Sequence, residues 1–85
     1  MLYGVSSLFW KIENDMNRFG EKLRTLRKRR GLSQTEMAEI LGVQQSYVGK
    51  LERGERAPNV TMIRKVAELF NVSFDQLMND AVGLE

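Results

Sequence analysis

The sequence predicts an all-α protein, and three observations support that expectation. Between residues 19 and 78, apolar side chains recur every three or four positions, which is the spacing of an amphipathic helix. No segment alternates polar and apolar residues for long, as a half-buried strand would. Serine, asparagine and glycine residues stand where short helices would begin and end. Together these patterns predict five short helices in a single domain.

The first predicted helix covers residues 19–30 and carries a run of positive charge. Phe19, Leu23 and Leu26 share its apolar face, and Gly31 ends it in a left-handed cap position. The whole chain has a formal net charge of only +2, so the run is a local positive patch. Such a patch is either a nucleic-acid contact or a solvated helix face. Its cations are Lys22, Arg24, Arg27, Lys28, Arg29 and Arg30.

The second and third predicted helices form a helix-turn-helix across residues 34–53. Ser33 and Glu36 have the spacing of a capping box at its start. Gly42 permits the positive φ of the turn, and Ala38 is small where the two helices approach most closely. An ordinary helical hairpin would share the apolar spacing but has no reason to combine these two residues. The apolar contacts between the helices are Met37, Leu41, Val43, Val48 and Leu51.

Two more helices complete the predicted domain. Asn59 caps a helix over residues 60–70, and Ser73 with Gln76 forms a second capping box at the start of the last helix. The residues expected to face inward are Ile63, Val66, Ala67 and Phe70 in the first of these helices and Phe74, Leu77 and Met78 in the second.

Residues 1–18 form an N-terminal extension to the domain at residues 19–79, and residues 80–85 form a short tail. The extension has the apolar spacing of an additional helix. We expect it to cover the core, to contact a second copy of the chain or to bind a protein partner. Its apolar stripe consists of Leu8, Phe9, Ile12 and Met16, with Trp10 beside it.

Composition excludes several classes of protein. The 85 residues, 42% of them hydrophobic, suffice for one small domain. The chain has no cysteine and no histidine, which excludes disulfides, zinc fingers, haem ligation and catalysis by histidine. No activated nucleophile or phosphate-binding loop is found, so neither an enzyme nor a cofactor is expected. The first residues lack the pattern of a secretion signal or a membrane span, and we expect a cytoplasmic protein.

Over residues 19–78 the chain resembles the Cro and phage-repressor type of helix-turn-helix domain, also called the xenobiotic-response-element family. The resemblance is carried by FGEKLRTLRKRRGLSQTEMAEILGV, QQSYVGKLERGERAP and NVTMIRKVAELFNVSFDQLM. Its most specific pieces are GLSQTEMAEILGV, LERGERAP and FNVSFDQL. The resemblance implies a five-helix, repressor-like DNA-binding domain whose third helix, the recognition helix, lies in the major groove.

The resemblance also implies which side chains read bases. These are Gln44, Gln45, Ser46 and Lys50 in the third helix. Gln45 would pair with adenine, and Lys50 would reach guanine acceptors. The alternatives are a weak helix cap for Gln44 and a phosphate contact for Ser46. Gly49 departs from the family pattern, which either lets the backbone approach a thymine methyl or removes one readout contact.

Other positions are matched to the DNA backbone or to the fold. Gln34 resembles the glutamine that binds phosphate at the start of the second helix in this family. Arg53 and Arg56 follow the recognition helix and are either phosphate contacts or solvated. In similar proteins an arginine and a glutamate at the positions of Arg27 and Glu52 pair with each other. We therefore assign these two residues to structure.

These observations and the resemblance imply a transcription regulator that binds double-stranded DNA sequence-specifically. A homodimer that represses from a palindromic operator is expected, because one recognition helix contacts too few base pairs for adequate specificity. Its interface would use residues 73–82 or the apolar stripe of residues 5–16. The alternative is an antitoxin or another protein-interaction module whose partner binds the N-terminal extension.

Overall fold

Five α-helices and no strands make up residues 18–85, the part of the chain that the computed structural model describes. The all-α prediction is therefore confirmed. The additional helix and the apolar stripe expected before residue 18 lie outside the described residues. The helices are α2 (Arg18–Arg29), α3 (Gln34–Leu41), α4 (Gln45–Glu52), α5 (Val60–Phe70) and α6 (Phe74–Met78).

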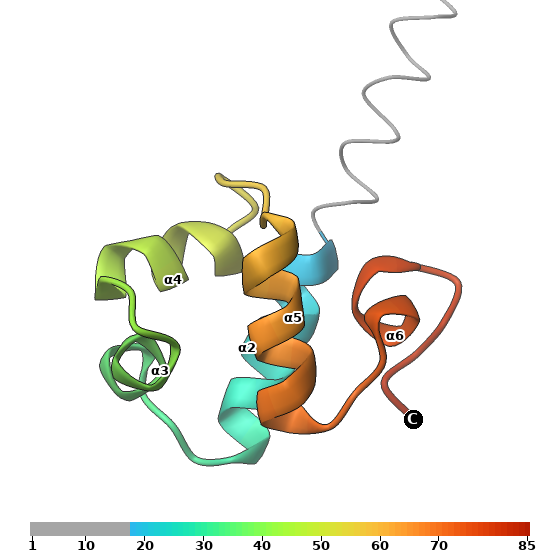
Figure 1. Ribbon diagram of the computed structural model, residues 1–85, viewed down its shortest axis with the longest axis horizontal. Helices are drawn as coiled ribbons and strands as arrows, with labels where there is room; N and C mark the ends of the chain where they lie inside the picture. The colour runs from blue at the N-terminus through green and yellow to red at the C-terminus, as the bar shows by residue number, and fades with distance from the viewer. Residues whose placement is uncertain (1–17) are drawn as a thin grey trace, which may run out of the picture.

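The helices are arranged around α2, which contacts both α4 and α6. In Figure 1, α3 and α4 lie on one side of α2 and α5, and α6 lies on the other with the C-terminal segment. The sides share one apolar core. Its buried residues are Phe19, Leu23, Leu26, Met37, Ala38, Leu41, Val48, Leu51, Met62, Ile63, Val66, Phe70 and Leu77.

Helix starts follow the capping residues that the sequence predicts. The Ser33 hydroxyl accepts a hydrogen bond from the Glu36 backbone N–H (3.0 Å), and the Ser33 N–H donates to the Glu36 carboxylate (2.8 Å). Ser73 and Gln76 repeat this capping box at α6. Asn59 caps α5 by accepting from a backbone N–H of the first turn. These bonds satisfy N–H groups that have no partner inside their helices.

The turn between α3 and α4 depends on Gly42. This residue ends α3 with φ 74° and ψ 34°, a left-handed conformation that glycine adopts without strain. The next residue, Val43, donates its N–H to the Ala38 carbonyl (2.9 Å) and packs partly buried against the core. The predicted turn glycine is confirmed, and Ala38 lies buried in the core.

One core prediction is wrong. Phe74 was expected inside, but 55% of its surface is exposed. Leu77 of the same helix is fully buried, and Met78 is partly buried against the core. Periodicity fixes the direction of a side chain around the helix axis but not whether another element covers that turn. Phe74 lies in the first turn of α6, and the described residues leave its ring in solvent.

The C-terminal segment folds back against the helices (Figure 1). Lys22 is only 9% exposed, and its ammonium donates to the backbone carbonyls of Gln76 (2.6 Å), Asn79 (3.0 Å) and Val82 (2.7 Å). Leu84 packs against the core. Residues 80–85, expected as a short tail, thus lie against α2 and α6.

Candidate nucleic-acid interface

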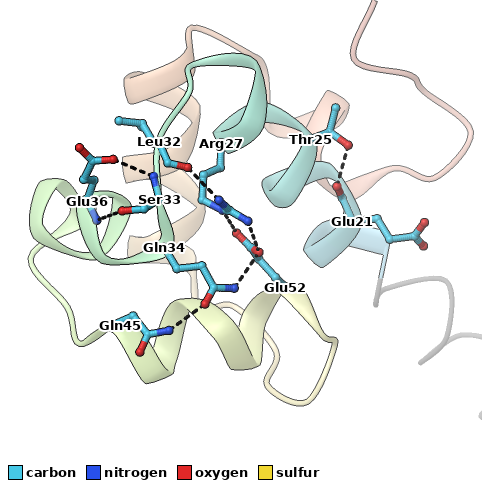
Figure 2. A network of polar contacts seen from close by, with 9 residues as sticks. All are labelled: Glu21, Thr25, Arg27, Leu32, Ser33, Gln34, Glu36, Gln45 and Glu52. Atoms are coloured by element: carbon cyan, nitrogen blue, oxygen red, sulfur yellow. Dashed lines mark hydrogen bonds and ion pairs between the residues drawn. The ribbon is translucent and has the colours of Figure 1, made fainter.

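A continuous polar network joins α2, α3 and α4 (Figure 2). Arg27 donates from Nε to Glu52 Oε2 (2.6 Å) and from Nη2 to Glu52 Oε1 (3.1 Å). The Gln34 side-chain NH₂ donates to the same Glu52 Oε1 (3.1 Å). The Gln45 NH₂ in turn donates to Gln34 Oε1 (2.7 Å). A buried ion pair is thereby connected to a side chain on the exposed face of α4.

The Arg27–Glu52 pair is the anchored end of this network. The side chains are 11% and 3% exposed, and the third guanidinium nitrogen of Arg27 donates to the Leu32 carbonyl (2.8 Å). The bidentate geometry satisfies both carboxylate oxygens and removes the pair from solvent competition. The structural role expected for these residues is confirmed, since the pair joins α2 to the last residue of α4.

Glu52 also determines how the two glutamines are oriented. An ionised carboxylate can only accept hydrogen bonds, so Gln34 must turn its NH₂ toward Glu52 and its carbonyl oxygen toward Gln45. Gln45 must then donate one N–H to Gln34. Its second N–H and its carbonyl oxygen make no hydrogen bond within residues 18–85, so this exposed side chain keeps one donor and one acceptor available.

The four residues matched to base contacts are all exposed on or beside α4. Gln44 is the N-cap residue, with φ −82° and ψ 150°, but its side chain makes no capping hydrogen bond. The alternative role of Gln44 as a side-chain cap is therefore not what the structure shows. Gln45 and Ser46 follow in the first turn of α4, and Lys50 lies in the last turn. Val48 and Leu51, on the opposite face, are buried in the core.

Arg53 and Arg56 lie just beyond α4 and are both exposed. Arg53 donates from Nε to Glu55 Oε2 (2.7 Å) and from Nη2 to Oε1 (3.3 Å). These hydrogen bonds lower the pKa of the Glu55 carboxyl, so the pair is intact at neutral pH and is lost as the pH falls through that lowered pKa. The Arg56 guanidinium lies 5.7 Å from the centre of the Tyr47 ring.

Gly49 lies beneath the guanidinium of Arg53, a contact that the sequence does not predict. A Cβ at this position would lie 3.1 Å from Arg53 Nη1 and 3.5 Å from Gln34 Oε1. The absent side chain therefore leaves room for the Arg53 guanidinium to fold back toward α3. Nothing in the local sequence indicates this, because the contact depends on the rotamer of a residue four positions later.

Four of the six cations in the basic run at residues 22–30 make contacts within the chain. Lys22 binds the C-terminal carbonyls, and Arg27 pairs with Glu52. Arg29 pairs with Glu85, and Arg30 stacks on Phe70 while donating to the Leu69 carbonyl (3.2 Å). Lys22 and Arg27 are thus used inside the fold, whereas Arg24, Lys28, Arg29 and Arg30 remain exposed on the surface. Within residues 18–85, the side chains of Arg24 and Lys28 form no hydrogen bond or ion pair.

A family model described as helix-turn-helix matches residues 23–77, which include α3, α4, α5 and the polar network. The chain belongs to the Cro/C1-type helix-turn-helix family. Like the members of this family, it is a transcription regulator with a DNA-binding fold and not an enzyme. No helix within residues 18–85 combines the length and apolar character needed to cross a bilayer.

Individual members of the helix-turn-helix family are similar over most of the domain. YazB of Bacillus subtilis, an HTH-type transcriptional regulator, is 37% identical over 59 residues, covering 69% of this chain and 86% of YazB. Several other relatives are longer, and this chain spans little more than half of them.

Two solved structures share the fold. The restriction-modification controller protein C.AhdI from Aeromonas hydrophila has a TM-score of 0.68 at 38% identity, covering 76% of this chain and 98% of its own. The P22 c2 repressor, crystallised with a synthetic operator, has a TM-score of 0.68 at 26% identity, covering 73% of this chain and 94% of its own.

Proposed function

We propose that the chain binds double-stranded DNA sequence-specifically, with α4 in the major groove, and represses transcription from the site it occupies. The observation that carries the proposal is the hydrogen bond from Gln45 to Gln34, which holds an exposed side chain of α4 in one orientation. The likeness to the P22 c2 repressor supports the same reading of the fold.

In this proposal Gln45 reads adenine. The outward donor and acceptor of its amide match the N7 acceptor and N6 amino donor that adenine presents in the major groove. Pre-orientation by Gln34 lowers the entropy that Gln45 loses on binding. Gln44, Ser46 and Lys50 contact neighbouring bases, with Lys50 directed to guanine.

Selection of bound sequences from a random pool of duplex DNA tests the proposal. A defined sequence motif is expected, and the absence of any enriched sequence would contradict sequence-specific binding. The Gln45→Ala variant should then bind the selected site more weakly by about 1–3 kcal/mol and accept other bases at one position. Urea unfolding serves as the control, because an exposed substitution changes stability by less than about 0.5 kcal/mol.

Gln34, Arg53 and Arg56 hold the DNA backbone in this proposal. Arg53→Ala should weaken binding to selected and unrelated duplexes alike and reduce the slope of log K against log salt by about one unit. Titrations at several salt concentrations measure both quantities. Weakening confined to the selected sequence would instead assign Arg53 to base recognition.

The proposed regulator acts as a homodimer on a palindromic operator. Selected sequences should then contain two inverted half-sites whose centres are about 10 base pairs, or a multiple of that spacing, apart. Repression is tested by placing the selected site in a promoter that drives a reporter, where expression of the chain should lower the signal.

The alternative of an antitoxin or interaction module rests on the N-terminal extension, which lies outside the described residues. It stays a prediction from the sequence. Deleting residues 1–16 tests it: unchanged oligomeric state and unchanged stability would count against a role in self-association or in covering the core, and would favour a foreign partner.

A further inference from the structure

The Arg53–Glu55 pair lies at the edge of the proposed DNA interface, and both side chains are about half exposed, at 56% and 54%. Its two hydrogen bonds use the Nε and Nη2 edge of the guanidinium. The same edge of arginine binds two oxygens of a phosphate in the same planar geometry. Glu55 therefore covers the surface of Arg53 that a phosphate contact requires.

The remaining nitrogen of Arg53 does not offer an equivalent site. Nη1 lies over Gly49, where an added Cβ would be 3.1 Å from it and 3.5 Å from Gln34 Oε1. Arg53 thus lies between the side chain of Glu55 and the α3–α4 network. A DNA phosphate that binds its Nε edge has to displace the carboxylate.

We propose that Glu55 stands in for a DNA phosphate on Arg53 in the free protein, and that it lowers the affinity for DNA by competing for this arginine. The inference rests on the proposed function. The competition lowers the affinity for every duplex on which Arg53 binds a phosphate, because each such complex has to displace Glu55 from the Arg53 guanidinium.

The pair has the properties that such a competitor needs. It is solvent-exposed, so exchange of one oxygen partner for another leaves no buried charge unpaired. It joins residues two positions apart, so it forms without closing a long loop. The pair of Arg27 and Glu52, by contrast, cannot open without leaving two largely buried charges unpaired.

The test compares Glu55→Gln with the parent chain on a fluorescent mixed-sequence duplex of about 20 base pairs, two turns of DNA. Anisotropy titrations between about 50 and 200 mM salt give the affinity and its salt dependence. Glu55→Gln should bind the duplex about two- to fivefold more tightly, because the usual strength of an exposed ion pair corresponds to a change in affinity of this size. Glu68→Gln on α5 is the matched control, since it removes the same charge from an exposed glutamate outside the network.

The Arg53→Ala background separates competition from simple repulsion between Glu55 and DNA. If Glu55 acts through Arg53, the gain from Glu55→Gln disappears in Arg53→Ala. An equal gain in that background, an equal gain in Glu68→Gln, or no gain at all would overturn the inference. If the parent chain and Glu55→Gln bind the duplex with the same affinity, only this inference is contradicted. If the parent chain binds no duplex, the proposed function is contradicted as well.

Discussion

Gly20 and Gly49 both lie inside helices, but the space around them differs. A Cβ at Gly20 would collide with the Leu51 carbonyl oxygen and would lie 2.7 Å from that of Glu52, both of which are backbone atoms of α4. Backbone cannot move aside without moving the helix. Gly20 is therefore what allows α2 and α4 to approach closely.

Gly20→Ala should lower the free energy of unfolding by about 1–3 kcal/mol, the usual cost of overpacking, despite the better helix propensity of alanine. Urea unfolding followed by circular dichroism measures the change. Unaltered stability would mean that α2 and α4 can separate at no cost.

The same substitution at Gly49 should have the opposite sign. The atom in the way is the end of the flexible, exposed Arg53 side chain, which can turn aside. Gly49→Ala should therefore raise the free energy of unfolding by up to about 1 kcal/mol through helix propensity. A loss of stability comparable to that of Gly20→Ala would show that Arg53 is held rigidly over α4.

The helix α2 connects the rest of the domain through two buried cations. Arg27 binds Glu52 at the end of α4, and Lys22 binds the carbonyls that follow α6. Neither contact is an isolated surface pair, because each replaces the hydration that a buried charge has lost. The basic character of α2 thus stabilises the packing of helices on its two sides.

Glu52→Ala should lower the free energy of unfolding by about 3–5 kcal/mol, because the Arg27 guanidinium stays in a site that is only 11% exposed without its counter-charge. Thermal or urea unfolding measures this loss. Glu68→Ala on the exposed face of α5 is the control and should leave stability within about 0.5 kcal/mol. Equal behaviour of the two variants would contradict a buried pair.

Lys22→Met removes three charge-assisted hydrogen bonds to the C-terminal segment. The free energy of unfolding should fall by at least about 1.5 kcal/mol. In hydrogen exchange, the amides of Asn79 and Val82 should lose protection while those of α3 and α4 keep it. Uniform loss of protection across all five helices would instead show that the segment unfolds only with the whole domain.

The molecule as a whole leaves an apolar side chain on the outside of α6. Phe74 is 55% exposed, and α6 is one of the two segments expected from the sequence at the dimer interface. Phe74→Glu should convert a dimer to monomers in sedimentation equilibrium and remove any dependence of the unfolding midpoint on protein concentration. Cooperative binding to a two-half-site duplex should be lost with it, and an intact dimer would assign the interface to another surface.

Features that depend on near neighbours were predictable from sequence, and features that depend on distant ones were not. Ser33 and Glu36, three residues apart, indicate the start of a helix, and Gly42 indicates the turn that follows it. Lys22 looked like one more cation of a basic run, because its three carbonyl partners lie 54 to 60 residues away. Phe74 fits the helical period, but the period does not say which elements cover it.

The candidate site shows the same division. The family resemblance identifies the residues of α4 that are matched to base contacts, and these assignments remain predictions. The hydrogen bond between Gln34 and Gln45 spans 11 residues and two helices, so only the packing of α3 on α4 reveals it. The position of Arg53 over Gly49 likewise depends on how the arginine side chain folds back along α4, which the sequence does not indicate.

The network that ends at Gln45 has a consequence for attempts to redirect such a protein to new DNA. Exchanging only the exposed residues of α4 would leave Gln34 with an unmatched oxygen, and grafting α4 into another scaffold would leave Gln45 without its support. A successful transplant has to carry Gln34, Glu52 and Arg27 along with the reading residues. The unit that can be exchanged between regulators of this kind therefore extends over three helices.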